Sequence, residues 1–459
     1  MSVLIISLQE LKVNIQEVKT VKELNEISAA FLTLGCKVNQ YETDSMTEIL
    51  KSHGTKIADF NDKADIYIVN TCSVTNIADR KSRQMLHKAR KKNPDAVIVA
   101  VGCYAQAAGR QLENDDAVDL IISNNRKKNI ADILYAYINR MDTSDSFIDI
   151  SQEKCFEEMK LSHISSHTRA YIKIQDGCNQ FCSYCIIPYV RGRIRSREPE
   201  DIIEEITRLS ADGIKEVVLT GIHISSYGMD KENGVNLLEL IKHISKIKSI
   251  ERIRLGSLEP GIITEEFVSA ISSMEKICPH FHLSLQSGCD TVLKRMNRRY
   301  TSQDYLEKCE LIRTYYDRPA ITTDVIVGFP GETDEEFQQT CDFLERINFY
   351  EMHIFKYSPR KGTVAAGMPG QISPEIKEQR SHILLQMSER HMMAYNRLFD
   401  NEPVNVLVEE VVTDDTGTYL RGHTERYHDV FIYADDISRP ADFINTMVVA
   451  SGTMPYLHT

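Results

Sequence analysis

The chain has 459 residues, of which 42% are hydrophobic and 26% are charged, and its formal net charge is −12. This is the composition of a multidomain globular protein; the acidic balance argues against indiscriminate nucleic-acid binding, and no apolar run approaches the roughly 20 residues that span a bilayer. Because residues 1–13 also lack the features of a signal peptide, we expect a cytoplasmic protein with reduced cysteines and no membrane partner.

Residues 29–145 are expected to form a small doubly wound α/β domain, preceded by an extension, 1–28, to which no role is assigned. Four apolar runs alternate there with helical stretches: AAFLTLG, ADIYIVN, AVIVAVG and VDLIIS. Cys36, Cys72 and Cys103 each follow one of the first three runs. Parallel strands end at one sheet edge, so these cysteines are expected to meet there. One such cysteine alone would more often be a buried apolar residue, but three equivalent positions favour a metal site.

Residues 165–398 are expected to form a partial (β/α)6 barrel, after a linker at 146–164 that has no clear periodicity. Six apolar runs alternate with amphipathic stretches, and they read AYIKIQD, EVVLTGI, RIRLGS, HFHLSLQS, AITTDVIVGF and MHIFKYS. Each run is followed by a loop rich in small and polar residues. In parallel α/β folds such loops meet at the carboxyl ends of the strands, which predicts a cofactor pocket at that rim.

The loop after the first barrel strand, GCNQFCSYC, carries Cys178, Cys182 and Cys185 with the spacing C-x3-C-x2-C. Structural zinc usually takes four protein ligands, and no fourth ligand with suitable spacing follows. A four-iron cluster held by three thiolates would keep one iron open to a small molecule. The spacing favours such a cluster, with a zinc knuckle or a chance grouping as the alternative.

The segment RGRIRSR follows this loop directly and contains Arg191, Arg193, Arg195 and Arg197 without any acidic residue. The guanidinium group of arginine can donate two parallel hydrogen bonds to phosphate oxygens. These four residues are therefore candidates for holding RNA near the open iron. Two other basic segments, 80–92 and 293–300, are equally consistent with solvated surfaces.

The C-terminal part begins with a long helical segment at 374–399 and then turns to short strands. Residues 399–459 are expected to form a small all-β domain, either a barrel or a sandwich. Residues 401–459 contain ten acidic and three basic residues, which is unusual for a domain that grips RNA.

Several of these motifs together resemble a known family. C-x3-C-x2-C with Tyr184 before its last cysteine, on the first loop of a six-unit barrel, is similar to the radical S-adenosylmethionine superfamily. TLGCKVNQYET, VNTCSVTNIADRKSRQ, VGCYAQ, LQSG, LKRMNRRY and VGFPGET resemble the methylthiotransferases within it. YLRGHTERYHDVFI resembles, more weakly, the TRAM domain of this family.

The resemblance implies two [4Fe–4S] clusters and S-adenosylmethionine as cofactors. Cys178, Cys182 and Cys185 would hold the radical-generating cluster, and Cys36, Cys72 and Cys103 an auxiliary cluster that carries the sulfur. Protein groups would orient S-adenosylmethionine and exclude water. The implied cofactor-binding residues lie at the barrel rim: Tyr184, Gly221, Ser257, Glu259, Gln286, Gly328 and Glu332.

The segment TLGCKVNQYET, around the first cysteine, resembles the same segment in the branch of the family that acts on N6-threonylcarbamoyladenosine at position 37 of tRNA. The implied partners are the anticodon stem-loop of tRNA and an electron donor such as flavodoxin or ferredoxin. The alternatives are a methylthiotransferase acting on isopentenyladenosine or on a protein. An alternative of another class is a noncatalytic iron–sulfur protein that binds RNA.

Overall fold

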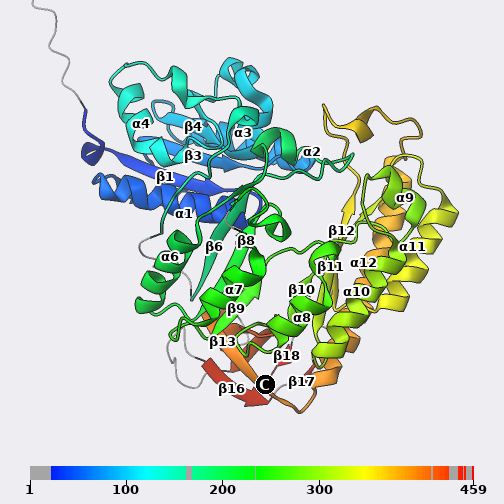
Figure 1. The fold of residues 1–459 in the computed structure, drawn as a ribbon. Helices are drawn as coiled ribbons and strands as arrows, with labels where there is room; N and C mark the ends of the chain where they lie inside the picture. Colours follow the sequence, from blue (N-terminus) through cyan, green and yellow to red (C-terminus); the bar gives the residue numbers. More distant parts are fainter. Residues whose placement is uncertain are drawn as a thin grey trace, which may run out of the picture.

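The computed structural model describes residues 22–161, 168–232, 234–414, 417–433, 443–447, 449–450 and 457–458. It has a mixed α/β architecture with an N-terminal α/β unit, a central half-barrel and a C-terminal β-sheet (Figure 1). Most of the extension expected at 1–28 lies outside these residues. Within the described residues, no helix combines the length and apolarity needed to cross a bilayer.

The N-terminal unit is a parallel sheet in the strand order β2-β1-β3-β4-β5. The chain enters at β1 and adds strands on both sides, which is the doubly wound arrangement predicted from the sequence. Its strands are β1 (Ser28–Thr33), β2 (Lys56–Ala58), β3 (Ile66–Thr71), β4 (Val97–Val101) and β5 (Leu120–Ile122). Its helices are α1 (Lys37–Ser52), α2 (Asn76–Lys92), α3 (Gly102–Ala108) and α4 (Ile130–Ile138).

The central unit is an open half-barrel of parallel strands, as the six alternating runs predicted. Two hydrogen-bonded groups, β6-β8-β9 and β10-β11-β12, are joined by the bridge between Leu258 and Leu283. The strands are β6 (Arg169–Asp176), β8 (Glu216–Gly221), β9 (Arg252–Leu255), β10 (His280–His282), β11 (Ala320–Val327) and β12 (Glu351–Lys356), with the short β7 (Arg195–Ser196) antiparallel to β6.

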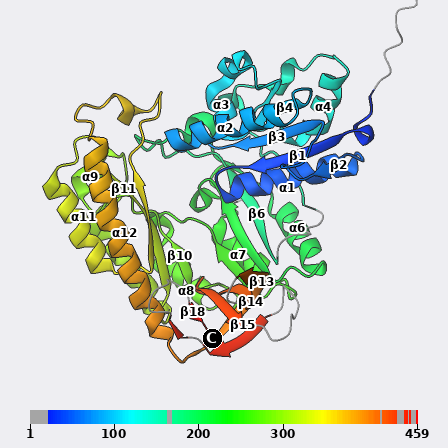
Figure 2. The same ribbon diagram turned by 180° about the vertical axis from the view of Figure 1, so that it is seen from behind.

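Helices between these strands cover the outer face of the half-barrel (Figures 1 and 2). They are α6 (Pro199–Ala211), α7 (Leu237–Ser245), α8 (Glu265–Ser272), α10 (Ser302–Tyr315), α11 (Asp334–Ile347) and, after the last strand, α12 (Pro374–Asn396). The short helices α5 (Ile187–Arg191) and α9 (Asp290–Arg295) lie in the loops after β6 and β10. Strand residues that face these helices, such as Ile172, Leu219 and Ile253, are fully buried in one apolar core that continues into the N-terminal unit. Burial of this shared apolar surface contributes to holding the two units together.

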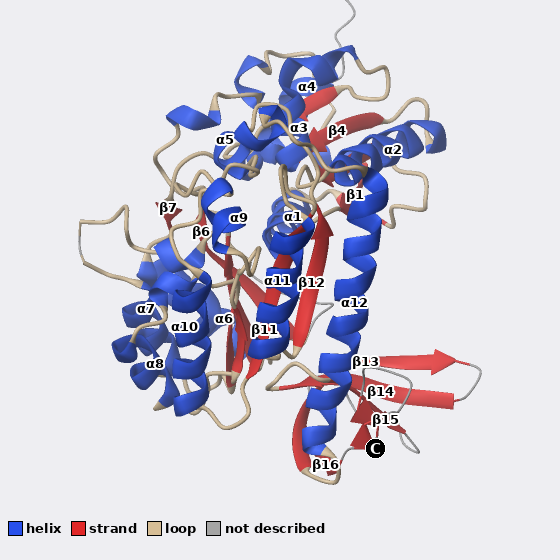
Figure 3. Cartoon of the chain, turned by 90° about the vertical axis from the view of Figure 1, so that its right-hand side faces the viewer, coloured by secondary structure: helices blue, strands red, loops and turns tan. Residues whose placement is uncertain are grey.

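The C-terminal unit is a β-sheet in the order β16-β13-β14-β15-β18-β17, in which only the β15–β18 pair is parallel among the described strands. It lies beneath the barrel at the end of α12, opposite the N-terminal unit (Figure 3). Its strands are β13 (Pro403–Asp414), β14 (Gly417–Thr424), β15 (Asp429–Tyr433), β16 (Phe443–Met447), β17 (Val449–Ala450) and β18 (Leu457–His458).

The segment expected to be a linker, 146–164, is described as far as residue 161 and packs against both larger units. Met159 and Leu161 are 3% and 1% exposed, and the Tyr41 hydroxyl donates to the Met159 carbonyl. Glu158 pairs with Arg197 of the barrel. The few buried residues of the segment are spaced irregularly, so its sequence shows neither a helical nor a strand period. Its contacts help to hold the N-terminal unit and the barrel together.

Candidate active site

The first set of cysteines lies at one edge of the N-terminal sheet. Cys36, Cys72 and Cys103 follow β1, β3 and β4, which are neighbours in the strand order. Gly35 approaches Cys72 so closely that a Cβ placed on it would lie 2.9 Å from the Cys72 Sγ, and its φ of +101° is one that few side chains tolerate. The structure therefore brings the three predicted positions together, and glycine is needed for the approach.

The second set lies on the loop after β6. Gly177, with φ +72°, precedes Cys178, and a Cβ there would fall 1.8 Å from the Arg193 carbonyl oxygen. The loop then turns so that the Cys185 N–H donates to the Cys182 carbonyl at 2.9 Å. Cys178 and Cys185 each lie within electrostatic range of Cys182, so the three sulfurs form one group.

The chemistry of both thiol sets fits an iron–sulfur cluster. All eleven cysteines are unpaired thiols. Burial, together with the neighbouring cysteines, raises the pKa of Cys72 to about 11 and that of Cys185 to about 12. Three adjacent thiolates are thus unfavourable on their own, and a multiply charged metal group is what allows them to ionise together.

A direct contact links the two sets. Helix α5, which follows the barrel cysteines, packs on α3, and Ile186 and Val190 bury Cys103. The Arg191 Nε donates to the Cys103 Sγ at 3.3 Å. A residue six positions after Cys185 therefore contacts a cysteine of the other set, and the distance between the sets depends on this short helix.

Arg191 also belongs to a buried ionic network between the two units. Glu42, which is fully buried, accepts from Arg191 at 2.6 Å, from Lys127 at 2.7 Å and from Lys173 at 2.7 Å. Burial alone would raise the pKa of Glu42, but these three cations hold it well below its ordinary value. Asp176 pairs with Lys173 and Arg191 as well. The network stays intact only if all its members remain together.

The arginine segment differs from what its charge suggested. Arg191, Arg195 and Arg197 are 0%, 1% and 0% exposed. Arg195 donates to the Arg191 carbonyl at 2.8 Å, and Arg197 pairs with Glu158 and Glu205. These three guanidinium groups cannot reach RNA phosphates because they are enclosed by protein. Arg193 is exposed, and its guanidinium lies 4.4 Å from the centre of the Phe181 ring.

Two residues expected to bind the cofactor lie beside the barrel cysteines. Tyr184 is half-buried and lies close enough to Cys182, Cys185 and Arg298 to interact with them electrostatically. Glu259 accepts from Gln180 at 2.8 Å and pairs with Arg298 at 3.3 Å. Burial alone would raise the pKa of Glu259, but a hydrogen bond from His223 and the charge of Arg298 outweigh it, so the carboxylate stays ionised.

Arg298 is a site residue that the sequence reasoning missed. Its Nη1 donates to the Cys182 Sγ at 3.2 Å, and its Nε donates to the Tyr300 hydroxyl at 2.9 Å. Its motif, LKRMNRRY, is basic and carries part of the family resemblance. Nothing in the sequence indicates which of its four basic residues faces a cysteine.

The remaining rim candidates divide into two groups. Gly221 ends β8, Ser257 follows β9 and is exposed, and Gln286 bridges to β11 with φ +74°. Glu332, by contrast, is 3% exposed, and its Oε2 accepts from the Gly328 N–H at 2.7 Å and from Arg380 at 2.6 Å. Glu332 therefore stabilises the turn at Gly328, and its burial leaves it no access to a ligand.

Comparisons with known proteins agree with this geometry. The model of the radical SAM superfamily matches residues 172–344, and that of an uncharacterized protein family, UPF0004, matches residues 28–123. The threonylcarbamoyladenosine tRNA methylthiotransferase MtaB of Bacillus subtilis (strain 168) is 38% identical over 87% of this chain and 89% of its own.

A second relative carries a different name. The tRNA-2-methylthio-N(6)-dimethylallyladenosine synthase of Syntrophus aciditrophicus (strain SB) is 37% identical over 82% of each chain. Among solved structures, the radical S-adenosylmethionine methyltransferase TsrM from Kitasatospora setae, with cobalamin and a [4Fe–4S] cluster bound, aligns with a TM-score of 0.55. It covers 72% of this chain and 76% of its own at 15% identity, so the likeness is one of fold.

Proposed function

Because the chain belongs to the methylthiotransferase family of the radical S-adenosylmethionine superfamily, we propose that it transfers a methylthio group to N6-threonylcarbamoyladenosine at position 37 of tRNA. The observation that carries the proposal is the pair of cysteine triads, one on each sheet, joined by the contact of Arg191 with Cys103. An aromatic carbon needs both radical activation and a sulfur donor, and two adjacent metal groups can divide these tasks.

Cys178, Cys182 and Cys185 would hold one [4Fe–4S] cluster together with S-adenosylmethionine, and Cys36, Cys72 and Cys103 would hold the other. Bound there, the barrel cluster would supply an electron that cleaves one S-adenosylmethionine, and the auxiliary cluster would supply a sulfur that takes a methyl group from a second S-adenosylmethionine and is transferred together with it. The chain itself orients these groups. Arg298 and Arg191 each donate an N–H to a cysteine sulfur, and Glu259 stays ionised beside the barrel loop.

The test is anaerobic turnover with reconstituted full-length protein, S-adenosylmethionine, a reductant and tRNA that bears threonylcarbamoyladenosine. We expect mass spectrometry of the digested nucleosides to show the 2-methylthio derivative. Parallel reactions use tRNA bearing isopentenyladenosine or unmodified adenosine. Product on isopentenyladenosine alone would favour that branch, and cleavage of S-adenosylmethionine without any product would point to another substrate.

RNA binding requires exposed cations near the barrel rim. Arg193 meets this requirement, and we assign it a contact with the backbone of the anticodon stem-loop. The reductant would be a small electron carrier such as flavodoxin or ferredoxin, in the cytoplasm where tRNA is modified. The acidic C-terminal sheet is a weaker candidate for the RNA contact because like charges repel phosphates.

Substitution of Arg193 and Arg191 by methionine should separate binding from stability. Arg193→Met is expected to lower the salt slope of tRNA binding by about one and to leave the melting temperature unchanged. Arg191→Met leaves Glu42 and Asp176 short of a buried cation, and it should cost about 3–5 kcal/mol of stability. Fluorescence anisotropy at several salt concentrations and thermal unfolding measure the two effects. An unchanged slope for Arg193→Met would remove Arg193 from the RNA interface.

A further inference from the structure

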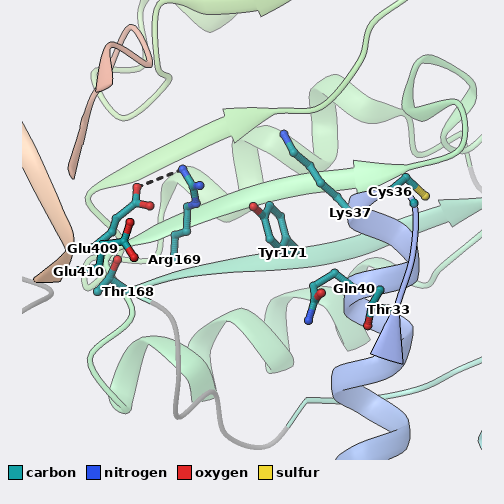
Figure 4. Close-up of a pocket in the computed structure, with 10 residues that line it drawn as sticks. Thr33, Cys36, Lys37, Gln40, Thr168, Arg169, Tyr171, Glu409 and Glu410 are labelled. Carbon is teal, nitrogen blue, oxygen red and sulfur yellow. Dashed lines mark ion pairs between the residues drawn. The ribbon is translucent and has the colours of Figure 1, made fainter. Parts of the chain in front are cut away.

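A polar pocket opens beside the N-terminal cysteine set, at the junction of the three units (Figure 4). Its volume of about 500 Å³ is that of a small-ligand site. The pocket runs along β6, from Cys36 and Lys37 at one end to Thr168 and the glutamates of β13 at the other. The described lining contains no aliphatic side chain; it consists of Thr33, Gly35, Cys36, Lys37, Gln40, Thr168, Arg169, Tyr171, Glu409 and Glu410.

Lys37 is the charged side chain of this pocket for which the described residues provide no ion pair. Its ammonium lies 5.8 Å from the centre of the Tyr171 ring and 5.9 Å from that of Tyr427. In the described part of the chain, its ammonium makes no ion pair or hydrogen bond; Glu216, which acts on it from a distance, is itself paired with Arg254. The side chain is exposed to the pocket, held between one ring from the barrel and one from the C-terminal sheet. Cation–π contacts of this kind position an ammonium group but do not neutralise it.

The other charges that surround the pocket are already paired. Arg169 contacts Glu409 at 3.1 Å, and Glu409 also accepts from His423 at 2.8 Å. Glu410 pairs with Arg421 at 2.8 Å. These pairs keep both glutamates from neutralising Lys37.

Within the part of the chain that the structure describes, the inner face of the barrel beyond Lys37 adds no free anion. Arg254, whose guanidinium lies over the Tyr427 ring, pairs with Glu216 at 2.9 Å. At the far end of the pocket the buried hydroxyl of Thr168 has no partner among the described residues. Among the residues that the structure describes, the pocket therefore offers one free cation and one free hydroxyl to a polar, anionic group.

We propose that this pocket binds the threonylcarbamoyl group of the substrate nucleoside, with the Lys37 ammonium paired to its carboxylate. The inference rests on the proposed function and extends it to the residue that selects the nucleoside. Of the lining residues, Cys36 is the one expected to hold the auxiliary cluster, and it borders the pocket.

The chemistry of the two candidate nucleosides supports this choice. The threonylcarbamoyl group carries a carboxylate, a hydroxyl and a urea, all of which need polar partners. A dimethylallyl group is a hydrocarbon and would find no aliphatic wall among the described lining residues. N6 and C2 share the Watson–Crick edge of adenine, so a group attached at N6 lies close to C2. A pocket that begins at Cys36 places that group beside the cysteines expected to hold the sulfur donor.

The test compares RNA stem-loops that differ only in the charge of this group. One stem-loop carries threonylcarbamoyladenosine, the second its neutral threonine carboxamide, and the third unmodified adenosine. Full-length reconstituted protein is titrated anaerobically and binding is followed by fluorescence anisotropy. The variants are Lys37→Met, Lys37→Arg and, as a matched control at the other end of α1, Lys51→Met, which is exposed. Iron content and circular dichroism establish that each variant is folded and loaded.

Wild-type protein and Lys51→Met should bind the carboxylate stem-loop about 10- to 100-fold more tightly than its carboxamide. Lys37→Met should bind the two equally, with its affinity for the carboxamide unchanged, and Lys37→Arg should keep the preference. A preference that survives in Lys37→Met overturns the proposal. An equal loss on all three stem-loops also overturns it, because Lys37 would then contact a phosphate.

Failure of the pocket assignment and failure of the proposed function give different results. If wild-type protein forms methylthiolated product but lacks the carboxylate preference, only the pocket assignment fails. If wild-type protein forms no product on threonylcarbamoyladenosine and product on isopentenyladenosine, the proposed function itself fails.

Discussion

Replacement of Cys178, Cys182 and Cys185 together by alanine is expected to halve the iron content and to abolish formation of 5′-deoxyadenosine. Anaerobically reconstituted wild-type protein should hold about eight irons, in two four-iron clusters. The barrel triad sits on a single loop after β6, so its removal leaves the N-terminal triad on its own sheet. We therefore expect about four irons to remain in the variant. Iron analysis and chromatography of the nucleoside products measure the two effects.

A matched control removes three thiols that belong to neither set. Cys155, Cys309 and Cys341 lie outside both groups, and Cys155 is exposed while the other two are buried in the core. Their combined replacement by alanine should keep the full iron content, at a modest cost in stability from the two small cavities. If the barrel variant kept all its iron, the assignment of these ligands would be wrong.

The architecture could be predicted from the sequence because its signals are local. Each barrel strand is a short apolar run that ends in a glycine or a polar residue, and each helix between strands shows amphipathic spacing. The order of the barrel strands then follows because consecutive βα units usually lie side by side and cross over with the same right hand. The convergence of Cys36, Cys72 and Cys103 was predictable for the same reason, since each follows a strand that belongs to one parallel sheet.

The arginine segment shows where local reasoning fails. RGRIRSR contains no acidic residue, so its charge pointed to RNA. Its counter-ions come from distant positions: Glu42 lies 149 residues before Arg191, and Glu158 lies 39 residues before Arg197. Pairing of this kind depends on how two units dock, and no window of sequence contains both partners. Three of the four arginines consequently hold the fold together.

The pocket beside Lys37 could not be predicted from the sequence for a related reason. Its walls come from α1, from β6 and from β13, three segments that are separated by more than a hundred residues each. In the sequence, nothing distinguishes Lys37 from an ordinary basic residue at the start of a helix. Only the docked structure shows that, among the described residues, Lys37 makes no ion pair while the neighbouring Arg169 and Arg254 are each paired with a glutamate.

Replacement of Cys36, Cys72 and Cys103 together by alanine is expected to abolish methylthiolated product while cleavage of S-adenosylmethionine persists. The barrel triad is carried by a different sheet, so it should still bind its cluster and the cofactor. The readout is paired: 5′-deoxyadenosine and 2-methylthio nucleoside are measured in one reaction on tRNA bearing threonylcarbamoyladenosine.

Folding of this variant must be checked first, because Cys103 is 4% exposed and packs against Ile186 and Val190 of the barrel segment. Thermal unfolding and iron content, which should again fall to about four irons, establish that the barrel set is intact. Arg191 loses its sulfur acceptor in the variant but keeps Glu42 and Asp176, so the two units should remain docked. In a folded variant, continued methylthiolation would refute the sulfur-donor role of the N-terminal set. Loss of both products would mean that the two sets act as one unit, coupled through the short helix that joins Cys185 to Arg191.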